Sequence, residues 1–444
     1  MEWHKLFSDT RLCRPDAAPQ KGRSPFQQDI DRITFSAAFR RLAHKTQVHP
    51  LSTNDHVHTR LTHSIEAASV GRSLGTGVGE ELAPRIGKQP TITRDTFGYV
   101  VQAACLAHDI GNPPFGHSGE HAIQSWFKAQ KTNPSSRLFR KLHEMRYDDF
   151  TLFDGNAQGF RTITQLEDAK WAGGLQLTHA VLGTLMKYPC ASTVVTDDYI
   201  GAKKPGFFGS EENYFRDVAD NVSLQKRDND AMSWSRHPLA FLVEAADDIC
   251  YKIIDIEDGY ELGYLSFVEA KDILWAIAND GSNLTALPAQ ESDQIGKLRA
   301  VSVGIAVNEC IRVFMENNDE IVEGRFNHPL VELTKIKDQL HHASEMARAR
   351  IFSSEAITRR EITGATVIEG LLDIFAEVIV DLIDVEFQPK KLRGNTERLA
   401  RLMGKPILRV DNPYSALLCL TDFVSGMTDR FAVDTYRTLK GISL

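Results

Sequence analysis

The chain has 444 residues and a formal net charge of −8, from 51 Lys and Arg against 59 Asp and Glu. Hydrophobic residues make up 42% of it and charged residues 25%, which is typical of a globular protein with a large core and excludes disorder as the main state. The 30 Gly and 17 Pro follow no period, which excludes a collagen-like chain, and the acidic balance argues against wrapping of nucleic acid over the whole surface.

The N-terminal sequence, MEWHKLFSDTRLCRPD, carries charges throughout and has no apolar core, so we expect no signal peptide. The six cysteines include no C-x-x-C pair and are too sparse for a disulfide framework, which predicts reduced thiols. These features favour a cytoplasmic protein.

Helical periods dominate the chain, and strand-like alternation is rare. The expected helices cover residues 61–74, 99–109, 119–129, 238–257, 296–316, 328–349, 366–386, 396–403 and 414–430. Turn-forming residues cluster at 15–25, 86–95, 111–116, 131–136 and 202–213. The best strand candidate is Ser192–Thr196, and Gly71–Gly77 is interpreted as a helix end because no strand precedes it, as a nucleotide-binding loop would require. The pattern predicts one large, mainly α-helical unit.

The densest chemistry follows the helix predicted at 99–109. His108 and Asp109 end that helix, because the Gly-Asn-Pro-Pro turn after them cannot continue it. An adjacent imidazole and carboxylate can bind the same divalent ion. Taken alone, however, such a pair is most often a surface accident, and a His is more often a hydrogen-bonded core residue than a ligand.

Two other predicted helices carry candidate ligands. His63 lies among small and apolar residues in the first, and Asp247 and Asp248 lie among apolar residues in the helix at 238–257. Consecutive acids on a buried helix are unfavourable unless each is paired or bound to metal. The alternative is a helix that exposes both acids to solvent.

His117 and Glu120 lie three residues apart where a new helix begins, so Glu120 can hold the His117 ring and raise its basicity. The alternative interpretation is that Ser118 caps this helix, with Glu120 in the first turn, where a carboxylate is favourable in any case. Both arrangements can exist together.

The ordered combination H…HD…D, with the HD pair followed by GNPPFGHSGE, resembles the HD-domain metal-dependent phosphohydrolases, and more narrowly their deoxynucleoside-triphosphate triphosphohydrolase (dGTPase) branch. Further matching stretches begin at Asp29, Lys45, Lys203 and Ala246, so the resemblance covers residues 25–260 well and the remainder loosely. It implies an all-α fold: an N-terminal segment at 1–56 that contributes to the nucleotide pocket, an HD core at 57–260 with an insertion at about 131–235, and a C-terminal helical lobe at 261–444.

The resemblance also implies the metal ligands, which are His63, His108, Asp109 and Asp247. Asp247 is preferred to Asp248 because the family pattern continues with Tyr251 and Asp255, which share its helix face. This mixed nitrogen and oxygen set suits Mn²⁺ or Mg²⁺, with Fe, Co and Ni as alternatives. In the family, the position of His117 and Glu120 carries the acid/base pair.

The residues that the resemblance places at the nucleotide are Gln47, Val48, Arg60, Asn112, His179, Tyr251 and Asp255. Gln47 and Val48 would meet the base and sugar. Arg60 and His179 would lie on the phosphate side, and Asn112 would contact a phosphate or the attacking water. Tyr251 and Asp255 would hold the deoxyribose and leave little room for a 2′-hydroxyl. Lys203 and Lys204 either reach the phosphates or form a solvated turn.

Two C-terminal regions bear on ligands and partners. Residues 359–364 fall where relatives close the pocket around the base, although Ala365 stands where many relatives carry an aromatic residue. A basic stretch at 390–409 is interpreted as a solvated face, or as a contact to phosphate, single-stranded nucleic acid or another subunit's triphosphate; it lacks the interleaved aromatic residues of base-stacking surfaces.

Residues 367–387 form the most apolar segment, but acids recur at nearly every turn. An amphipathic helix is therefore expected, not a membrane span, with an apolar face made of Ile368, Leu371, Leu372, Phe375, Ile379 and Leu382.

The predicted function is metal-dependent hydrolysis of a deoxynucleoside triphosphate, dGTP favoured, at the α-phosphorus, giving deoxynucleoside and tripolyphosphate. One alternative is an HD phosphatase acting on nucleoside monophosphates. Another is a non-catalytic dNTP sensor or single-strand-binding protein, against which the acid/base pair argues. The resemblance further implies a homo-oligomer, and single-stranded nucleic acid or a nucleotide activator as candidate partners.

Overall fold

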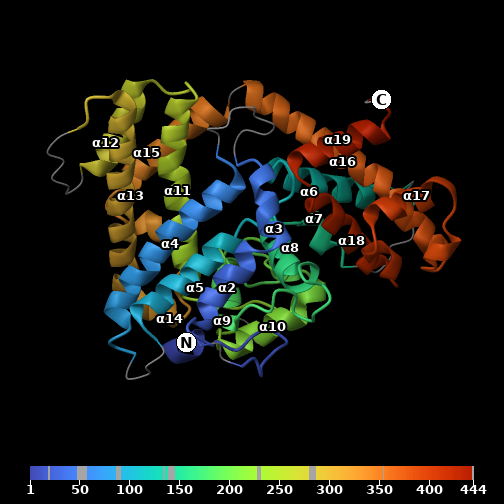
Figure 1. Ribbon diagram of the computed structural model, residues 1–444, viewed down its shortest axis with the longest axis horizontal. Coiled ribbons are helices and arrows are strands. Elements are labelled where there is room, and N and C mark those ends of the chain that lie inside the picture. The colour runs from blue at the N-terminus through green and yellow to red at the C-terminus, as the bar shows by residue number, and fades with distance from the viewer. Residues whose placement is uncertain are drawn as a thin grey trace.

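The computed structural model describes residues 1–18, 21–47, 58–86, 92–133, 136–138, 146–227, 232–279, 287–353 and 355–442. Helices dominate these ranges, in which β-structure is limited to isolated bridges, and the all-α prediction is confirmed (Figure 1). No helix in these ranges combines the length and apolarity needed to cross a membrane.

A large hydrophobic cluster joins the N-terminal half to the helices that follow it. Its helices are α1 (Trp3–Leu6), α2 (Pro25–Thr34), α3 (Ala37–Arg41), α4 (Arg60–Leu82), α5 (Arg94–Ala107), α8 (Gly155–Arg161), α9 (His179–Leu185), α10 (Glu212–Asn221), α11 (Ala240–Glu261), α12 (Phe267–Ala278), α13 (Glu291–Glu316), α14 (Asn318–Val322) and α15 (Lys337–Ala347). Figure 1 shows α12, α13 and α15 beside α11, so the predicted boundary at 260/261 falls inside this cluster.

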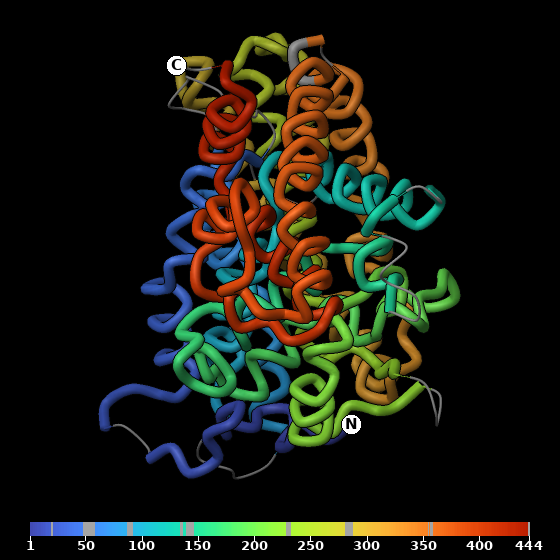
Figure 2. The backbone as a smooth tube through the Cα atoms, turned by 90° about the vertical axis from the view of Figure 1, so that its right-hand side faces the viewer, coloured from blue at the N-terminus to red at the C-terminus, as the bar shows by residue number. Residues whose placement is uncertain are grey.

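A second hydrophobic cluster lies between the C-terminal helices and the segment after the HD pair. Its helices are α6 (His117–Thr132), α7 (Asp148–Thr151), α8 (Gly155–Arg161), α16 (Glu355–Asp384), α17 (Gly394–Met403), α18 (Pro413–Ser425) and α19 (Asp429–Leu439). The predicted apolar face of α16 is fully buried in it, which confirms the amphipathic helix. Figure 2 shows α16–α19 stacked against the earlier part of the chain.

Short 3₁₀ and π segments connect these helices: η1 (Leu42–His44), η3 (Thr162–Leu166), η4 (Ser192–Val194), η5 (Ile200–Ala202), η6 (Gly209–Glu211), η7 (Leu330–Leu333), η8 (Arg348–Phe352), η9 (Pro389–Lys391) and η10 (Pro406–Arg409). The strand prediction at Ser192–Thr196 is therefore wrong: the Val194 N–H donates to the Ala191 carbonyl and closes a turn. Two predicted helices are each divided, at extended Thr334 and at extended Thr428, whose hydroxyl caps α19.

The interpretation of Gly71–Gly77 as a helix end is also wrong, because these residues lie inside α4. A Cβ on Gly75 would lie 2.7 Å from the Phe97 carbonyl oxygen, and one on Gly71 would lie 2.5 Å from Cys105 Sγ. The glycines therefore let α4 and α5 pack closely. This packing brings His63 on α4 near His108, the residue that ends α5.

Candidate functional site

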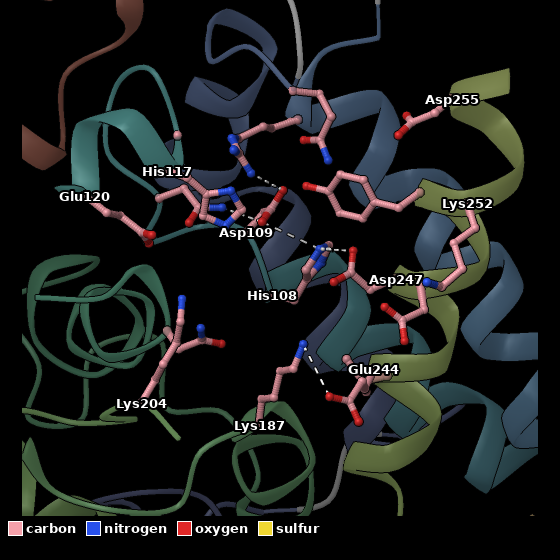
Figure 3. A pocket seen from close by; sticks show the side chains of 18 of the residues that line it. His108, Asp109, His117, Glu120, Lys187, Lys204, Glu244, Asp247, Lys252 and Asp255 are labelled. Atoms are coloured by element: carbon pink, nitrogen blue, oxygen red, sulfur yellow. Dashed lines mark hydrogen bonds and ion pairs between the residues drawn. The ribbon is translucent and has the colours of Figure 1, made fainter. Parts of the chain in front are cut away.

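A pocket of about 600 Å³ lies where α4, the end of α5, the start of α6 and α11 meet (Figure 3). Most of the predicted site residues line it: Gln47, Arg60, His108, Asp109, Asn112, His117, Glu120, Asp247, Tyr251 and Asp255. Val48 lies outside the described residues. The pocket therefore collects side chains from segments that are more than three hundred positions apart in the sequence, from Thr46 to Glu361.

Three side chains converge at one side of the pocket; His108 and Asp247 line it, whereas His63 is not among its described lining residues. His63, His108 and Asp247 each offer a ligand atom, and these atoms all lie within 4.8 Å of one another. The Asp247 Oδ1 atom is 3.0 Å from His63 Nε2 and 3.6 Å from His108 Nε2. His108 Nδ1 donates to the Cys105 carbonyl at 2.6 Å, so the neutral ring has its lone pair on Nε2, a buried atom with no hydrogen-bond partner among the residues that the structure describes. This is the orientation expected of a metal-binding imidazole.

Asp109 lies beside this group of three and not within it. Its Oδ1 is 3.6 Å from His108 Nε2 and accepts a hydrogen bond from Asn112, while its Oδ2 accepts one from Arg60 Nη1 at 2.8 Å. The two donors orient a carboxylate that is 6% exposed.

The charges of the site suit a cation. Burial opposes ionisation of Asp247, but His108 and His63 more than offset it and hold the pKa of Asp247 well below its usual range. Burial would also lower the pKa of His108, yet Asp109 and Asp247 raise it to about 9. Without metal the cluster therefore takes up a proton, and a divalent ion could supply positive charge in its place. The residues present fit such an ion.

His117 begins α6, and Glu120 lies in its first turn. The Glu120 carboxylate is buried and accepts the Gly155 N–H at 2.7 Å, and no hydrogen bond joins it to His117 in the described part of the chain. The predicted contact of Glu120 with the His117 ring is thus not seen; Glu120 Oε1 instead accepts the N–H of the first residue of α8. Ser118 does not cap α6 either: Gly116 is the N-cap, and the Ser118 hydroxyl donates to the Glu361 carbonyl.

The two side chains have opposite pKa shifts. Desolvation in the pocket and the Arg60 cation lower the pKa of His117, which favours the neutral ring at pH 7. Burial and the Asp154 carboxylate raise the pKa of Glu120 to about 7. A neutral imidazole and a readily protonated carboxyl are both suited to proton transfer near neutral pH.

The raised pKa of Glu120 predicts a pH dependence of stability. The folded protein keeps this proton between about pH 4.5 and pH 7, where the unfolded chain releases it, so the free energy of unfolding falls as the pH rises through this window. Glu120→Gln keeps an acceptor for Gly155 and cannot ionise, so we expect a flatter dependence and a higher Tm at pH 8. Thermal unfolding at several pH values measures this, with exposed Glu369→Gln on α16 as control. An unchanged slope would contradict the prediction.

Three further residues that were predicted to contact the nucleotide line the pocket: Gln47, Tyr251 and Asp255. Both polar atoms of the Gln47 amide are buried and find no hydrogen-bond partner within the described ranges, as expected of a group that awaits a ligand. The Tyr251 ring lies 4.8 Å from the His63 ring, between centroids. Asp255 lies one turn further along α11 and is 9% exposed.

His179 is not among the described residues that line the pocket, and its place on the phosphate side stays a prediction. It is the first residue of α9, and its ring contacts Thr10 Oγ1 at 2.8 Å and Asp217 Oδ2 at 3.2 Å. The helix start thus directs this ring toward the N-terminal segment and α10.

Beyond Arg60, four Lys or Arg side chains line the pocket: Lys187, Lys204, Lys252 and Arg348. Lys187 lies in a loop with no recognisable motif, and its ammonium is 3.5 Å from Glu244 Oε1. Glu244 is already bound by fully buried Arg236, whose Nη1 donates to it at 2.7 Å and whose Nε donates to the Lys187 carbonyl. Two cations thus share the Glu244 carboxylate, and the nearby Asp247 and Asp248 also favour the charged form of Lys187.

Lys204 is another of these cations, whereas its neighbour Lys203 does not line the pocket. The sequence offered Lys203 and Lys204 as equal candidates, and only the tertiary structure shows which of the two lies at the pocket. Glu361, from the predicted base-side region, lines the pocket as well, but the basic residues at 390–409 do not. In that stretch Arg401 pairs with Glu397 on an exposed helix face.

Comparisons with known proteins agree with this geometry. An HD domain model matches residues 60–149. A deoxyguanosinetriphosphate triphosphohydrolase-like protein of Synechocystis is 40% identical over the full length of both chains. One of Pseudomonas aeruginosa is 39% identical over 100% of this chain and 99% of its own. A deoxyguanosinetriphosphate triphosphohydrolase of Yersinia pseudotuberculosis is 31% identical over 93% of each chain.

Proposed function

The chain belongs to the HD-domain deoxyguanosinetriphosphate triphosphohydrolase family, and from this premise we propose that it hydrolyses dGTP, ahead of the other dNTPs, to deoxyguanosine and tripolyphosphate with a divalent metal. The observation that carries this proposal is one pocket at which the group His63, His108 and Asp247 meets an acid/base candidate, His117, and three lysines, Lys187, Lys204 and Lys252.

The metal would be held by His63, His108, Asp109 and Asp247. A divalent cation bound there supplies Lewis-acid polarisation of the phosphate oxygens and acidifies water. Mixed nitrogen and oxygen ligands without thiolate support Mn²⁺ or Mg²⁺.

The chain's own side chains bind the triphosphate and move protons. Lys187, Lys204 and Arg60 present positive charge to the phosphates. In the proposed reaction a water oxygen bonds to the α-phosphorus, and the bond from that phosphorus to the 5′-oxygen breaks. The 5′-oxygen then needs a proton. Neutral His117 can take a proton from the water and return it to the 5′-oxygen, and Glu120, protonated near pH 7, can share that task.

Incubation with each dNTP and Mn²⁺ or Mg²⁺, followed by separation of the products, tests the function. Deoxynucleoside and tripolyphosphate in equal amounts are expected, fastest from dGTP. Release of orthophosphate from nucleoside monophosphates alone would indicate the phosphatase alternative. Binding of dNTPs without any product would indicate the sensor alternative.

Selection of the deoxyribose is expected to depend on Tyr251. Its ring lies beside the metal-site residues, and Asp255 on the same helix face can accept a hydrogen bond from the 3′-hydroxyl. Together they would crowd a ribose, so dGTP should be cleaved much faster than GTP.

Tyr251→Ala should narrow the ratio of kcat/KM for dGTP over GTP while the protein keeps its metal. Tyr251→Phe, which keeps the ring, is the matched control and should retain the ratio. If the ratio in folded Tyr251→Ala equals that of the wild type, Tyr251 only packs in the core.

A further inference from the structure

A buried carboxylate in the C-terminal helices joins two segments of the pocket wall. Asp429, at the start of α19, is 3% exposed. Its Oδ2 accepts hydrogen bonds from the Thr46 N–H at 3.0 Å and the Thr46 hydroxyl at 2.6 Å, and its Oδ1 accepts the Phe115 N–H at 3.0 Å. Thr46 directly precedes Gln47, and Phe115 lies two residues before His117.

We propose that Asp429 is a positioning residue of the pocket, which acts through Thr46 and Phe115 to hold Gln47 and His117 in place. The proposal rests on the proposed function for its effect on turnover. It makes the α18–α19 turn part of the active-site machinery, although Asp429 itself does not line the pocket.

A second buried group joins the same three segments. The Lys45 ammonium donates to the Asn112 carbonyl at 2.5 Å and to the Ser425 carbonyl, in the last residue of α18, at 2.8 Å. Lys45 is 3% exposed, and burial together with the Arg41 cation lowers its pKa to about 7, whereas the Asp429 charge favours the protonated form. The contacts of Asp429 and Lys45 thus support one another at a single junction.

The backbone at Phe115 shows why this junction has to be held. Phe115 has a φ of 63°, in the left-handed region that a residue with a Cβ rarely adopts, and Gly116 follows with a φ of 56°. Such a conformation persists only where the surroundings constrain it. The constraints are the Asp429 hydrogen bond to the Phe115 N–H and the contact of the ring with Gly364, where a Cβ would lie 2.6 Å from Cγ. Loss of the hydrogen bond would let the backbone relax and move His117.

The experiment compares Asp429→Asn with Asp434→Asn, which changes an exposed acid one turn further along α19. An amide has one acceptor oxygen and would turn N–H donors toward either Thr46 or Phe115. We expect folded, metal-loaded Asp429→Asn to lose about 100-fold in kcat/KM for dGTP, the effect of displacing catalytic groups by about 1 Å. Asp434→Asn should match the wild type. A lower Tm with unchanged kcat and KM, measured well below the unfolding transition, would overturn the proposal.

Thr46→Val serves if Asp429→Asn does not fold. This variant removes the Thr46 hydroxyl donor and keeps the hydrogen bond from the Thr46 N–H to Asp429, so we expect a smaller loss of kcat/KM. The loss should come from a higher KM more than from a lower kcat, because Gln47 is the neighbour that moves. Wild-type KM and kcat in this variant would count against the proposal.

Hydrogen exchange gives a readout that needs no activity. Asp429→Asn, or Thr46→Val in its place, should speed amide exchange in peptides covering Thr46 and Phe115, which are remote in sequence, but not within α4. If the wild type cleaves no dNTP, the proposed function is wrong, but the exchange rates still show whether Asp429 positions the two segments. Unchanged exchange at both segments would overturn it.

Discussion

Asp247→Ala is expected to abolish both metal binding and turnover, whereas Asp248→Asn should keep the metal. Asp247 Oδ1 lies within 3.6 Å of both His63 Nε2 and His108 Nε2, so its removal takes away the carboxylate that the two imidazoles share. Asp248 lies outside this group, and burial and Glu244 raise its pKa to about 7, so it is a poorer anionic ligand. His63→Ala should behave like Asp247→Ala.

Measuring the metal content of the purified variants together with their rate of dGTP hydrolysis tests this prediction. Asn112→Ala provides a graded comparison, because it removes only a donor to Asp109 and should weaken metal affinity by about 10–100-fold without abolishing it. If Asp248→Asn lost the metal and Asp247→Ala kept it, the wrong acid of the pair would have been chosen.

His117→Ala is expected to keep its metal and to lose about 10²–10⁴-fold in kcat, the usual contribution of a general acid–base group. The side chain begins α6 at the exposed side of the pocket, so its removal should cost little stability. The activity of the wild type should fall as His117 becomes protonated, below pH 6.5, because its pKa is lowered. A variant with normal kcat would show that another group moves the proton.

The double variant His117→Ala/Glu120→Gln tests whether the two residues act as a unit. If they do, the double variant is little worse than His117→Ala, because residues that act together are not additive. The alternative is that Glu120 has a structural role, because it accepts a hydrogen bond from the Gly155 N–H. Full additivity would mean that Glu120 serves the turn into α8 and not the reaction.

Much of the site could be identified from the sequence because several of its residues are adjacent or lie one helical turn apart. His108 and Asp109 are adjacent, and Asp247, Tyr251 and Asp255 recur at a helical spacing that must place them on one face. The same argument predicted the buried face of α16 correctly. It did not foresee the neighbours of His179, because helical geometry says which side of α9 the ring occupies but not that Thr10 and Asp217 lie there.

The sequence by itself determined the helical class, the amphipathic C-terminal helix and the family of the chain, because periodicity and contiguous motifs are properties of neighbouring residues. Only the tertiary structure decided that Lys187 and Lys204 reach the pocket, that glycines in α4 serve packing on α5, and that Asp429 meets Thr46 and Phe115 across more than three hundred positions. These contacts form because buried polar groups must find hydrogen-bond partners once the helices pack. The partners come from segments that are distant in the sequence, so no local sequence pattern predicts them.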